Sequence, residues 1–155
     1  MAVLPVVMCF QSLILDMAGN VGTQSLAVTI RVLMDENLTV AQKLKLVVKE
    51  MKTGFLNGVC LAVMSFLFLG LYIHFFRKYD IGHSFLIAAC VGVSLIVAMV
   101  ISSLVGTVIP IFFKKIKVDP AVASGPLITT VNDLVAVVVY YGLTWIFLIN
   151  MLHIA

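Results

Sequence analysis

This 155-residue chain has little charge: Asp, Glu, Lys and Arg make up only 11% of it, whereas hydrophobic residues make up 63%. Its mean hydropathy is +1.19. Soluble domains carry about 25% charged residues, so this composition excludes an ordinary soluble domain and predicts an integral membrane protein surrounded by lipid. The net charge of +3 comes from lysines and arginines in short segments between apolar stretches, so we do not expect a nucleic acid partner.

Cysteines and catalytic motifs are also scarce. The three cysteines, Cys9, Cys60 and Cys90, lie in apolar runs without a CxxC pair, which excludes a disulfide framework or a zinc site. The first ten residues contain no basic segment and no cleavage site, so no signal peptide is expected. The sequence has no nucleophile–base pair, phosphate-binding loop or nucleotide signature, so we do not expect an enzyme.

Long apolar runs are what the chain has in abundance. A bilayer core of about 30 Å needs about 20 apolar residues in a helix. Helices are predicted instead of barrel strands, because the runs are continuously apolar and do not alternate. Four stretches qualify as transmembrane helices: residues 2–33, 53–76, 84–113 and 121–149.

A further helix is predicted over residues 38–52. Its apolar residues, such as Val40, Leu44 and Met51, recur at helical spacing between charged ones, and Thr39 begins a capping box that ends at Gln42. This pattern is typical of a short amphipathic helix on the cytoplasmic membrane surface. The fold class is therefore an all-α integral membrane protein. It has one domain, residues 1–155, with about four transmembrane helices and one amphipathic helix.

The basic residues are distributed unevenly. Four lie between the first and second predicted spans, and a fifth, Arg31, lies at the end of the first. Three lie between the third and fourth, whereas only Arg77 and Lys78 lie between the second and third. The positive-inside rule then places the first and third connections in the cytoplasm and both termini outside. This arrangement predicts a further helix before residue 1, and the location predicted is the cell (inner) membrane.

One carboxylate, Asp133, interrupts the last predicted span. A charge inside a bilayer is costly, and such residues usually face a partner, a water-filled cavity or an ion path. Asp133 belongs to a polar stripe at helical spacing, whose members are Thr129, Asn132, Asp133, Ala136 and Tyr140. Oxygen ligands suit a hard cation, and Mg²⁺ keeps several waters while binding one or two carboxylates. The alternative is that Asp133 caps or hydrogen-bonds a neighbouring helix.

The first predicted span carries a matching stripe: Ser12, Asp16, Gly19, Asn20, Thr23 and Ala27. Gly19 and Gly22 are expected to weaken the helix, which would expose backbone carbonyls to an ion. Alternatively, these glycines serve close helix packing. Asp16 is a second candidate ligand, unless it pairs with a basic residue or lies at an aqueous mouth.

Two features of the second half are structural predictions. Small residues recur every fourth position in the third span and predict a packing seam: Cys90, Ser94, Ala98, Ser102 and Gly106. Asp119 followed by Pro120 predicts a helix N-cap with proline at the first helical position, and this acidic group would face the cytoplasmic mouth of an ion path.

Two motifs at opposite ends of the chain resemble the membrane domain of MgtE-type magnesium channels and transporters and of related eukaryotic solute carriers. The first motif consists of Pro5, the run Gly19-Asn20-Val21-Gly22-Thr23-Gln24-Ser25, and Arg31. The second runs from Asp119-Pro120 to Asn132-Asp133 and resembles the last transmembrane helix of the family. Gly106-Thr107 and Pro110 between them also fit, so the resemblance covers essentially the whole chain.

The resemblance implies a homodimer of five-helix subunits with a cation pore along the dimer axis. Asp133 would be the central Mg²⁺-binding residue, with Thr129 beside it and Asp119 at the cytoplasmic mouth. By this resemblance we expect the sequence to lack the family's first helix and the cytoplasmic regulatory N and CBS domains of bacterial members, and those domains would be partners. The remaining residues expected to line the pore are Asp16, Gly19, Asn20, Thr23, Gly125, Pro126, Asn132 and Ala136.

One departure concerns Gly125, which precedes Pro126 where many bacterial members have Asn. The sequence thus predicts a channel or transporter that passes partly hydrated Mg²⁺ through a dimer interface, and Mn²⁺, Co²⁺ or Ni²⁺ would also suit oxygen ligands. A first alternative is a proton- or sodium-coupled carrier in which Asp16 and Asp133 alternate between protonated and cation-bound states. A second is a membrane scaffold whose polar stripes serve only helix packing.

Overall fold

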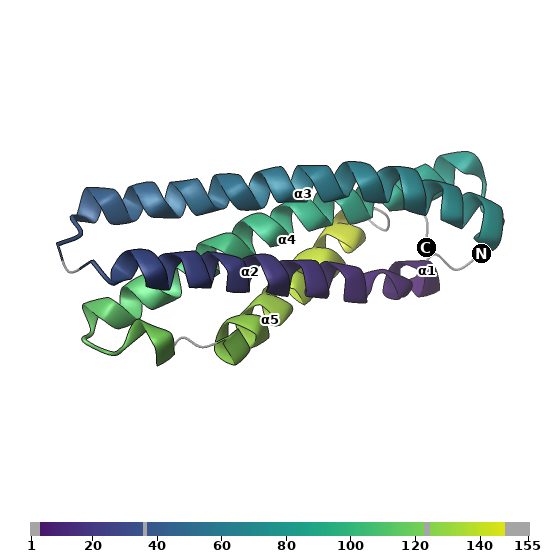
Figure 1. Cartoon of the computed structure of the whole chain (residues 1–155). Coiled ribbons are helices and arrows are strands. Elements are labelled where there is room, and N and C mark those ends of the chain that lie inside the picture. Colours follow the sequence, from purple (N-terminus) through teal and green to yellow (C-terminus); the bar gives the residue numbers. More distant parts are fainter. Residues whose placement is uncertain (1–3, 36, 123–124, 148–155) are drawn as a thin grey trace.

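The computed structural model describes residues 4–35, 37–122 and 125–147, and every regular element in them is helical (Figure 1). The all-α prediction is therefore confirmed. The predicted first span began at residue 2 and the predicted last span ended at residue 149, so both limits lie outside the described residues. The elements are α1 (Leu4–Cys9), α2 (Gln11–Leu33), α3 (Val40–Arg77), α4 (Ile81–Lys115), one turn of 3₁₀ helix, η1 (Pro120–Val122), and α5 (Gly125–Thr144).

Three stretches of the described chain are long and apolar enough to cross a membrane: α3, α4 and the segment Gly125–Phe147 that begins with α5. The first predicted span is divided into α1 and α2 at Phe10. At 1.5 Å per residue, the 23 residues of α2 would extend about 35 Å, enough for a bilayer core. Polar residues such as Asp16 and Asn20 lower the hydropathy of α2, and this helix is not among the three.

α4 is the central helix of the bundle and packs against α2, α3 and α5. In its most apolar window 56% of the residues are buried, against 17% for the peripheral α3. The predicted packing seam is confirmed, because all five of its small residues, from Cys90 to Gly106, are buried. Small side chains let helix backbones approach closely, which is how helices associate in lipid.

The backbones of α3 and α4 come into contact at two positions that lie one helical turn apart on α3. A Cβ atom built on Gly58 would lie 2.8 Å from the Cα atom of Ile96. One turn earlier, a Cβ on Gly54 would lie 2.8 Å from the carbonyl oxygen of Met99 and would overlap the Ser103 hydroxyl. Glycine is therefore required at both positions by close approach of the helices.

The prediction of a separate amphipathic helix over residues 38–52 was wrong. These residues and the second predicted span form one uninterrupted helix, the 38-residue α3, which begins with the predicted capping box at Thr39. The buried face is also different, because Val40 and Leu44 are 73% and 62% exposed whereas Glu50 is only 5% exposed. Glu50 lies one turn before Gly54, so the two residues share the face of α3 that packs on α4.

The predicted weakening of the first span at two glycines was also wrong. α2 is continuous from Gln11 to Leu33, and Gly19 and Gly22 are both buried within it. The alternative, that these glycines serve helix packing, is the one that the structure supports at Gly22, where a Cβ atom would overlap the amide of Asn132 on α5.

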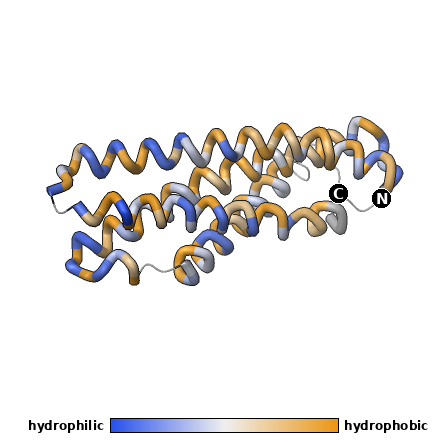
Figure 2. The backbone as a smooth tube through the Cα atoms, in the orientation of Figure 1, coloured by the Kyte–Doolittle hydropathy of each residue, from blue (hydrophilic) through white to orange (hydrophobic). Residues whose placement is uncertain are grey.

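The lysine-rich start of α3 and the lysine-rich end of α4 lie at one end of the bundle, and the α3–α4 connection lies at the other (Figure 1). Figure 2 shows hydrophilic residues gathered at the end with the lysines, on the start of α3 and after α4. The Lys114 ammonium donates to the carbonyl oxygens of Leu33 and, at 2.9 Å, of Asp35. It thereby satisfies carbonyl groups at the C-terminus of α2, where a positive charge also favours the helix dipole.

Candidate functional site

The candidate site lies where α5 crosses α2 in the antiparallel sense. At one end the Tyr140 hydroxyl donates to the carbonyl oxygen of Val7 at 2.7 Å, and the Tyr141 hydroxyl donates to Gln11 Oε1 at 2.6 Å. At the other end Asn132 of α5 lies against Gly22 of α2. These contacts join residues about 110–133 positions apart in sequence and fix the two polar stripes side by side.

A groove of about 370 Å³ runs between the two helices. Its walls come from both stripes, so the structure brings together segments at opposite ends of the chain as the sequence predicted. The lining residues are Ser12, Leu15, Asp16, Gly19, Asn20 and Thr23 from α2, and Thr129 and Asp133 from α5.

Hydrogen bonds within each helix orient the polar side chains of the groove. Asn20 Nδ2 donates to Asp16 Oδ2 at 3.4 Å, so the carboxylate and the amide lie together along one side of α2. The Thr23 hydroxyl donates to the carbonyl oxygens of Gly19 and Asn20, both at 3.0 Å. The Thr129 hydroxyl donates to the Gly125 carbonyl oxygen at 2.8 Å. Because each hydroxyl hydrogen is directed to a backbone carbonyl, the oxygen lone pairs remain available to a cation.

The groove supplies oxygen ligands and two carboxylates, Asp16 and Asp133. Hydroxyl, amide and carboxylate oxygens suit hard cations such as Mg²⁺, and among the described residues no thiol or imidazole lines the groove. Within the described residues no cluster of three or more His, Cys, Asp or Glu side chains could hold a metal. The groove therefore offers oxygen ligands of the kind that a partly hydrated cation uses, but the described residues do not form a fully liganded metal site.

Several residues predicted to line a pore do not line this groove. Asn132 and Ala136 are fully buried between helices. Gly125 and Pro126 lie at the start of α5, outside the groove. Asp119 is exposed in the connection before η1, where its Oδ1 accepts a hydrogen bond from the backbone N–H of Ala121 at 2.9 Å. It thus caps a single 3₁₀ turn, whereas the sequence placed the start of the last span there.

The outer face of α2 is polar although α2 lies in an apolar bundle. Ser12, Asp16, Asn20 and Gln24 follow one another at four-residue intervals, and all four are exposed. A row of this kind facing lipid would be costly, because lipid offers these groups no hydrogen-bond partner. The groove and this row form one continuous polar surface on the side of the bundle.

Comparison with known proteins shows the family of this chain. The family model MgtE, described as a divalent cation transporter, matches residues 11–143, which include every residue of the groove. The chain belongs to the MgtE family. A transporter family is not an enzymatic one, so the expectation that the chain is not an enzyme is confirmed, as is the resemblance on which that family was predicted.

Three curated relatives, each named magnesium transporter MgtE, align with most of this chain. The protein of Bacillus subtilis is 37% identical over 143 residues, or 90% of the chain. That of Enterococcus faecalis is 33% identical over 139 residues, also 90% of the chain. That of Thermus thermophilus is 35% identical over 127 residues, or 82%. The aligned part makes up 29%, 29% and 26% of these relatives, so the chain spans less than a third of their length.

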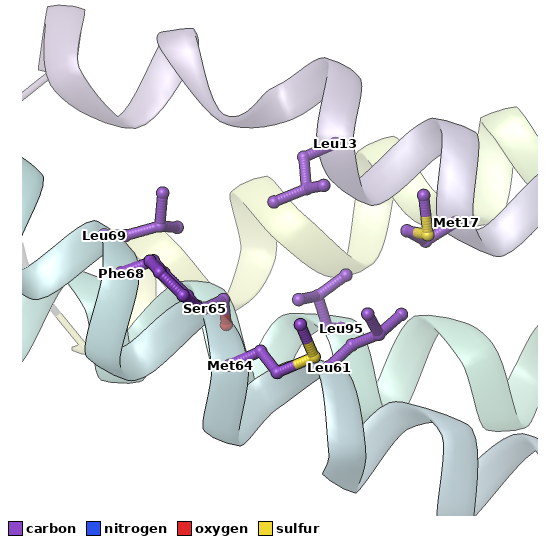
Figure 3. Close-up of a pocket in the computed structure, with 8 residues that line it drawn as sticks. All are labelled: Leu13, Met17, Leu61, Met64, Ser65, Phe68, Leu69 and Leu95. Atoms are coloured by element: carbon purple, nitrogen blue, oxygen red, sulfur yellow. The ribbon is translucent and has the colours of Figure 1, made fainter.

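Membership of the MgtE family and three apolar helices identify a multi-pass membrane protein. A second groove of about 200 Å³ between α2, α3 and α4 is almost wholly apolar, and only Ser65 contributes a polar side chain (Figure 3). The Ser65 hydroxyl donates to the carbonyl oxygen of Ala62 at 3.0 Å. Met17, Leu61 and Phe68 cannot replace the water of a cation, so this apolar groove is not a candidate cation site.

Sequence reasoning missed two features of the site. Leu15 lines the groove beside Asp16, and an apolar residue at that position gives no signal within a polar stripe. The contact between Gly22 and Asn132 was missed as well. The small-residue pattern was visible, but the partner of a glycine on another helix cannot be derived from its own sequence.

Proposed function

We propose that this chain forms the membrane pathway of a magnesium channel or transporter, in which Mg²⁺ passes along the groove between α2 and α5. The observation that carries the proposal is that Asp16 and Asp133 line the same groove on the side of a largely apolar bundle. The names of the relatives, magnesium transporters at 33–37% identity, point to the same ion. The cell (inner) membrane is the proposed location.

The size of the groove suits an ion that retains its water. A water molecule occupies about 30 Å³ of liquid, so the six waters of hydrated Mg²⁺ need about 180 Å³. The groove volume of 370 Å³ accommodates this shell. Asp133 serves as the central carboxylate, and the Thr129 oxygen helps to hold the hydration shell. Mn²⁺, Co²⁺ and Ni²⁺ meet the same ligands, and hydration governs which of these ions is favoured.

A second copy of the chain is proposed to close the groove. The exposed polar row on α2 needs a polar or aqueous neighbour, and a two-fold symmetric dimer would face this row with its own counterpart. Such a dimer doubles the carboxylates from two to about four around a shared path, which meets the ligand demand of Mg²⁺ better than a single chain does. The homodimer pore is thus proposed on the need to cover Asp16, Asn20 and Gln24.

The lysine-rich end is proposed to face the cytoplasm. An inside-negative potential then draws a cation inward by about 2.3 kcal/mol per charge per 100 mV, or about twice that for Mg²⁺. Asp119 lies in the connection at this end, where an exiting ion would meet it. Cytoplasmic regulatory domains, if joined to this chain or associated with it, would meet the same basic surface.

The test is Mg²⁺ uptake into proteoliposomes that contain the chain with Asp133→Ala. Outer-shell partners of a metal typically contribute about 10–100-fold to affinity or activity, so loss of a direct carboxylate ligand should lower uptake by about 100-fold or more. Asp35→Asn is the control: this carboxylate is exposed outside the groove, and its Oδ1 accepts a local hydrogen bond from the Asn37 N–H.

Equal uptake by the unmodified chain and Asp133→Ala would refute the pathway and favour a packing role for the stripes. Uptake that stops when a proton or sodium gradient is collapsed, with the Mg²⁺ gradient kept, would instead establish the coupled carrier. A channel needs only the Mg²⁺ gradient and the membrane potential.

A further inference from the structure

Asn132 occupies an unusual position for an amide. Its side chain is 0% exposed, and neither Oδ1 nor Nδ2 has a hydrogen-bond partner in the described part of the chain. A buried polar group without partners is disfavoured, by about 1–3 kcal/mol in typical proteins, and a native one requires an explanation. Hydrogen bonding does not explain Asn132 in this arrangement of the helices, so its shape is the property to consider.

The Asn132 amide lies directly on the backbone of α2. A Cβ atom built on Gly22 would overlap Asn132 Nδ2 and would lie 2.9 Å from its Cγ and 3.4 Å from its Oδ1. On α4, a Cβ built on Gly106 would overlap the Gly22 carbonyl oxygen and lie 3.1 Å from the carbonyl carbon. The amide of α5, the backbone of α2 and the backbone of α4 are therefore stacked in contact, and α2 cannot retreat from Asn132.

This contact lies immediately behind the groove. Gly22 is followed by Thr23, which lines one wall, and Asn132 is followed by Asp133, which lines the other. The thickness of the Asn132 side chain therefore sets how far the oxygen groups of α5 lie from those of α2.

We propose that Asn132 is a positioning residue that determines which cation the groove prefers. It does not touch the ion; it holds Asp133 and Thr129 at a separation from α2 that fits hydrated Mg²⁺ better than a larger cation. Ca²⁺ binds oxygen at about 2.3–2.6 Å and Mg²⁺ at about 2.0–2.1 Å, and Ca²⁺ loses water more readily, so the two ions respond differently to a change in groove width. This inference rests on the proposed function.

Four variants separate shape from polarity. Asn132→Ala removes all three atoms that a Cβ on Gly22 would meet, so α5 can settle closer to α2 and alter the groove. Asn132→Leu keeps the branched shape and removes both polar atoms. Gly22→Ala forces the helices apart, and in the double variant Gly22→Ala/Asn132→Ala the new methyl group enters the space that the amide has left.

The experiment measures the ratio of Mg²⁺ uptake to Ca²⁺ uptake in proteoliposomes of the full chain. Positioning groups around metals contribute about 10–100-fold, so Asn132→Ala and Gly22→Ala should each lower the ratio by about tenfold or more. Asn132→Leu should stay within about twofold of the unmodified ratio, and the double variant should recover part of the loss. Gly142→Ala on α5 is the control, because a Cβ there meets nothing within 4 Å.

A loss of preference in Asn132→Leu as large as in Asn132→Ala would overturn the inference, since the amide chemistry would then matter and not its shape. An unchanged ratio in Asn132→Ala would overturn it too. A second measurement needs no transport: thermal unfolding in detergent without Mg²⁺ should show that Gly22→Ala is less harmful when Asn132→Ala is also present. If the unmodified chain passes no Mg²⁺, the proposed function fails, and this coupling still decides whether Asn132 spaces the helices. Independent, additive effects would refute the contact.

Discussion

Individual glycines hold this bundle together where other residues would keep the helices apart. Gly58 allows α3 to approach Ile96 of α4 within contact of its Cα atom. In lipid, helix association depends on such packing and not on burial from water. A methyl group at this position meets backbone, which cannot move aside as the end of a flexible side chain can.

We therefore expect Gly58→Ala to destabilise the protein. Overpacking costs about 1–3 kcal/mol, whereas alanine gains about 1 kcal/mol over glycine within a helix. The net loss should be up to about 2 kcal/mol, measured as a lower midpoint of thermal unfolding in detergent micelles. Gly142→Ala has the same propensity gain with open space around the new methyl group, so its midpoint should rise. Two shifts of the same sign would show that the α3–α4 contact is looser than the structure indicates.

At this scale the sequence revealed only part of the site. Asp16, Asn20, Thr23, Thr129 and Asp133 were predicted as pore-lining or metal-binding candidates, because polar residues in an apolar span are rare and their spacing is visible. Asn132 and Ala136 belong to the same stripe, but they are buried between helices. A stripe covers a wide arc of a helix, and which part of the arc meets a neighbour depends on contacts such as Gly22–Asn132 that arise only in the folded bundle.

Among the elements, α3 differs most from expectation, and its start is well defined. The Thr39 N–H donates to Gln42 Oε1 at 2.8 Å, and the Gln42 N–H donates to Thr39 Oγ1 at 3.3 Å. This reciprocal pair satisfies two backbone donors at the helix N-terminus. The first turns of α3 have few other contacts, since Val40 and Leu44 are largely exposed.

Thr39→Ala should therefore loosen the start of α3 without affecting its membrane part. Loss of an N-cap costs about 1 kcal/mol, so amide hydrogen exchange over residues 40–46 should quicken about fivefold, while exchange over residues 60–75 should not change. Thr53→Ala is the matched control: its hydroxyl donates to the Lys49 carbonyl oxygen within the helix and caps nothing. Equal protection of residues 40–46 in both variants would mean that the cap contributes nothing to the stability of α3.

The continuity of α3 also shows a limit of sequence patterns for membrane helices. The change from charged to apolar residues near Lys52 indicates where the helix crosses from water into lipid, and it was interpreted as a boundary between two helices. No proline lies between the charged and apolar parts of α3. Gly54 lies near the boundary, but it remains helical, and its lack of a side chain serves the contact with α4. The composition of a segment indicates whether it is surrounded by water or by lipid. Only a capping or helix-breaking residue indicates where the helix ends.

In the whole of the described structure, polar side chains lie inside the bundle, along one side and at its ends, and most of the remaining surface is apolar. Buried serines and threonines lie on α4, while phenylalanines such as Phe68 and Phe76 are 68% and 75% exposed on α3. Lipid is the expected neighbour of that surface. The hydropathy of the sequence indicated this apolar surface. The distribution of lysines indicated that the two lysine-rich segments lie at the same end of the bundle.

Orientation in the membrane follows from that shared end. The three native cysteines, Cys9, Cys60 and Cys90, are first replaced by alanine. A membrane-impermeant maleimide added outside intact cells should then label Asp80→Cys and leave Lys45→Cys unlabelled until the cells are opened, because lysine-rich segments next to membrane spans stay in the cytoplasm. Both introduced cysteines replace residues that are at least partly accessible at the ends of the bundle. Labelling of Lys45→Cys from outside would reverse the proposed direction of the pathway and place Asp119 at the outer mouth.

The number of chains in one pathway is the last property to test. If two copies face each other across the polar row on α2, and both Asp133 carboxylates hold the ion, a mixed dimer with one Asp133→Ala chain should not conduct. When unmodified and variant chains are mixed in equal amounts before reconstitution, uptake should then fall to about one quarter of that of the unmodified chain, because only that share of random dimers is unmodified on both sides. A pathway within each single chain predicts about one half, and a dimer that needs only one carboxylate predicts about three quarters.

Asp35→Asn mixed in the same proportion should leave uptake unchanged. Among these outcomes only about one quarter supports an ion shared between two copies of Asp133.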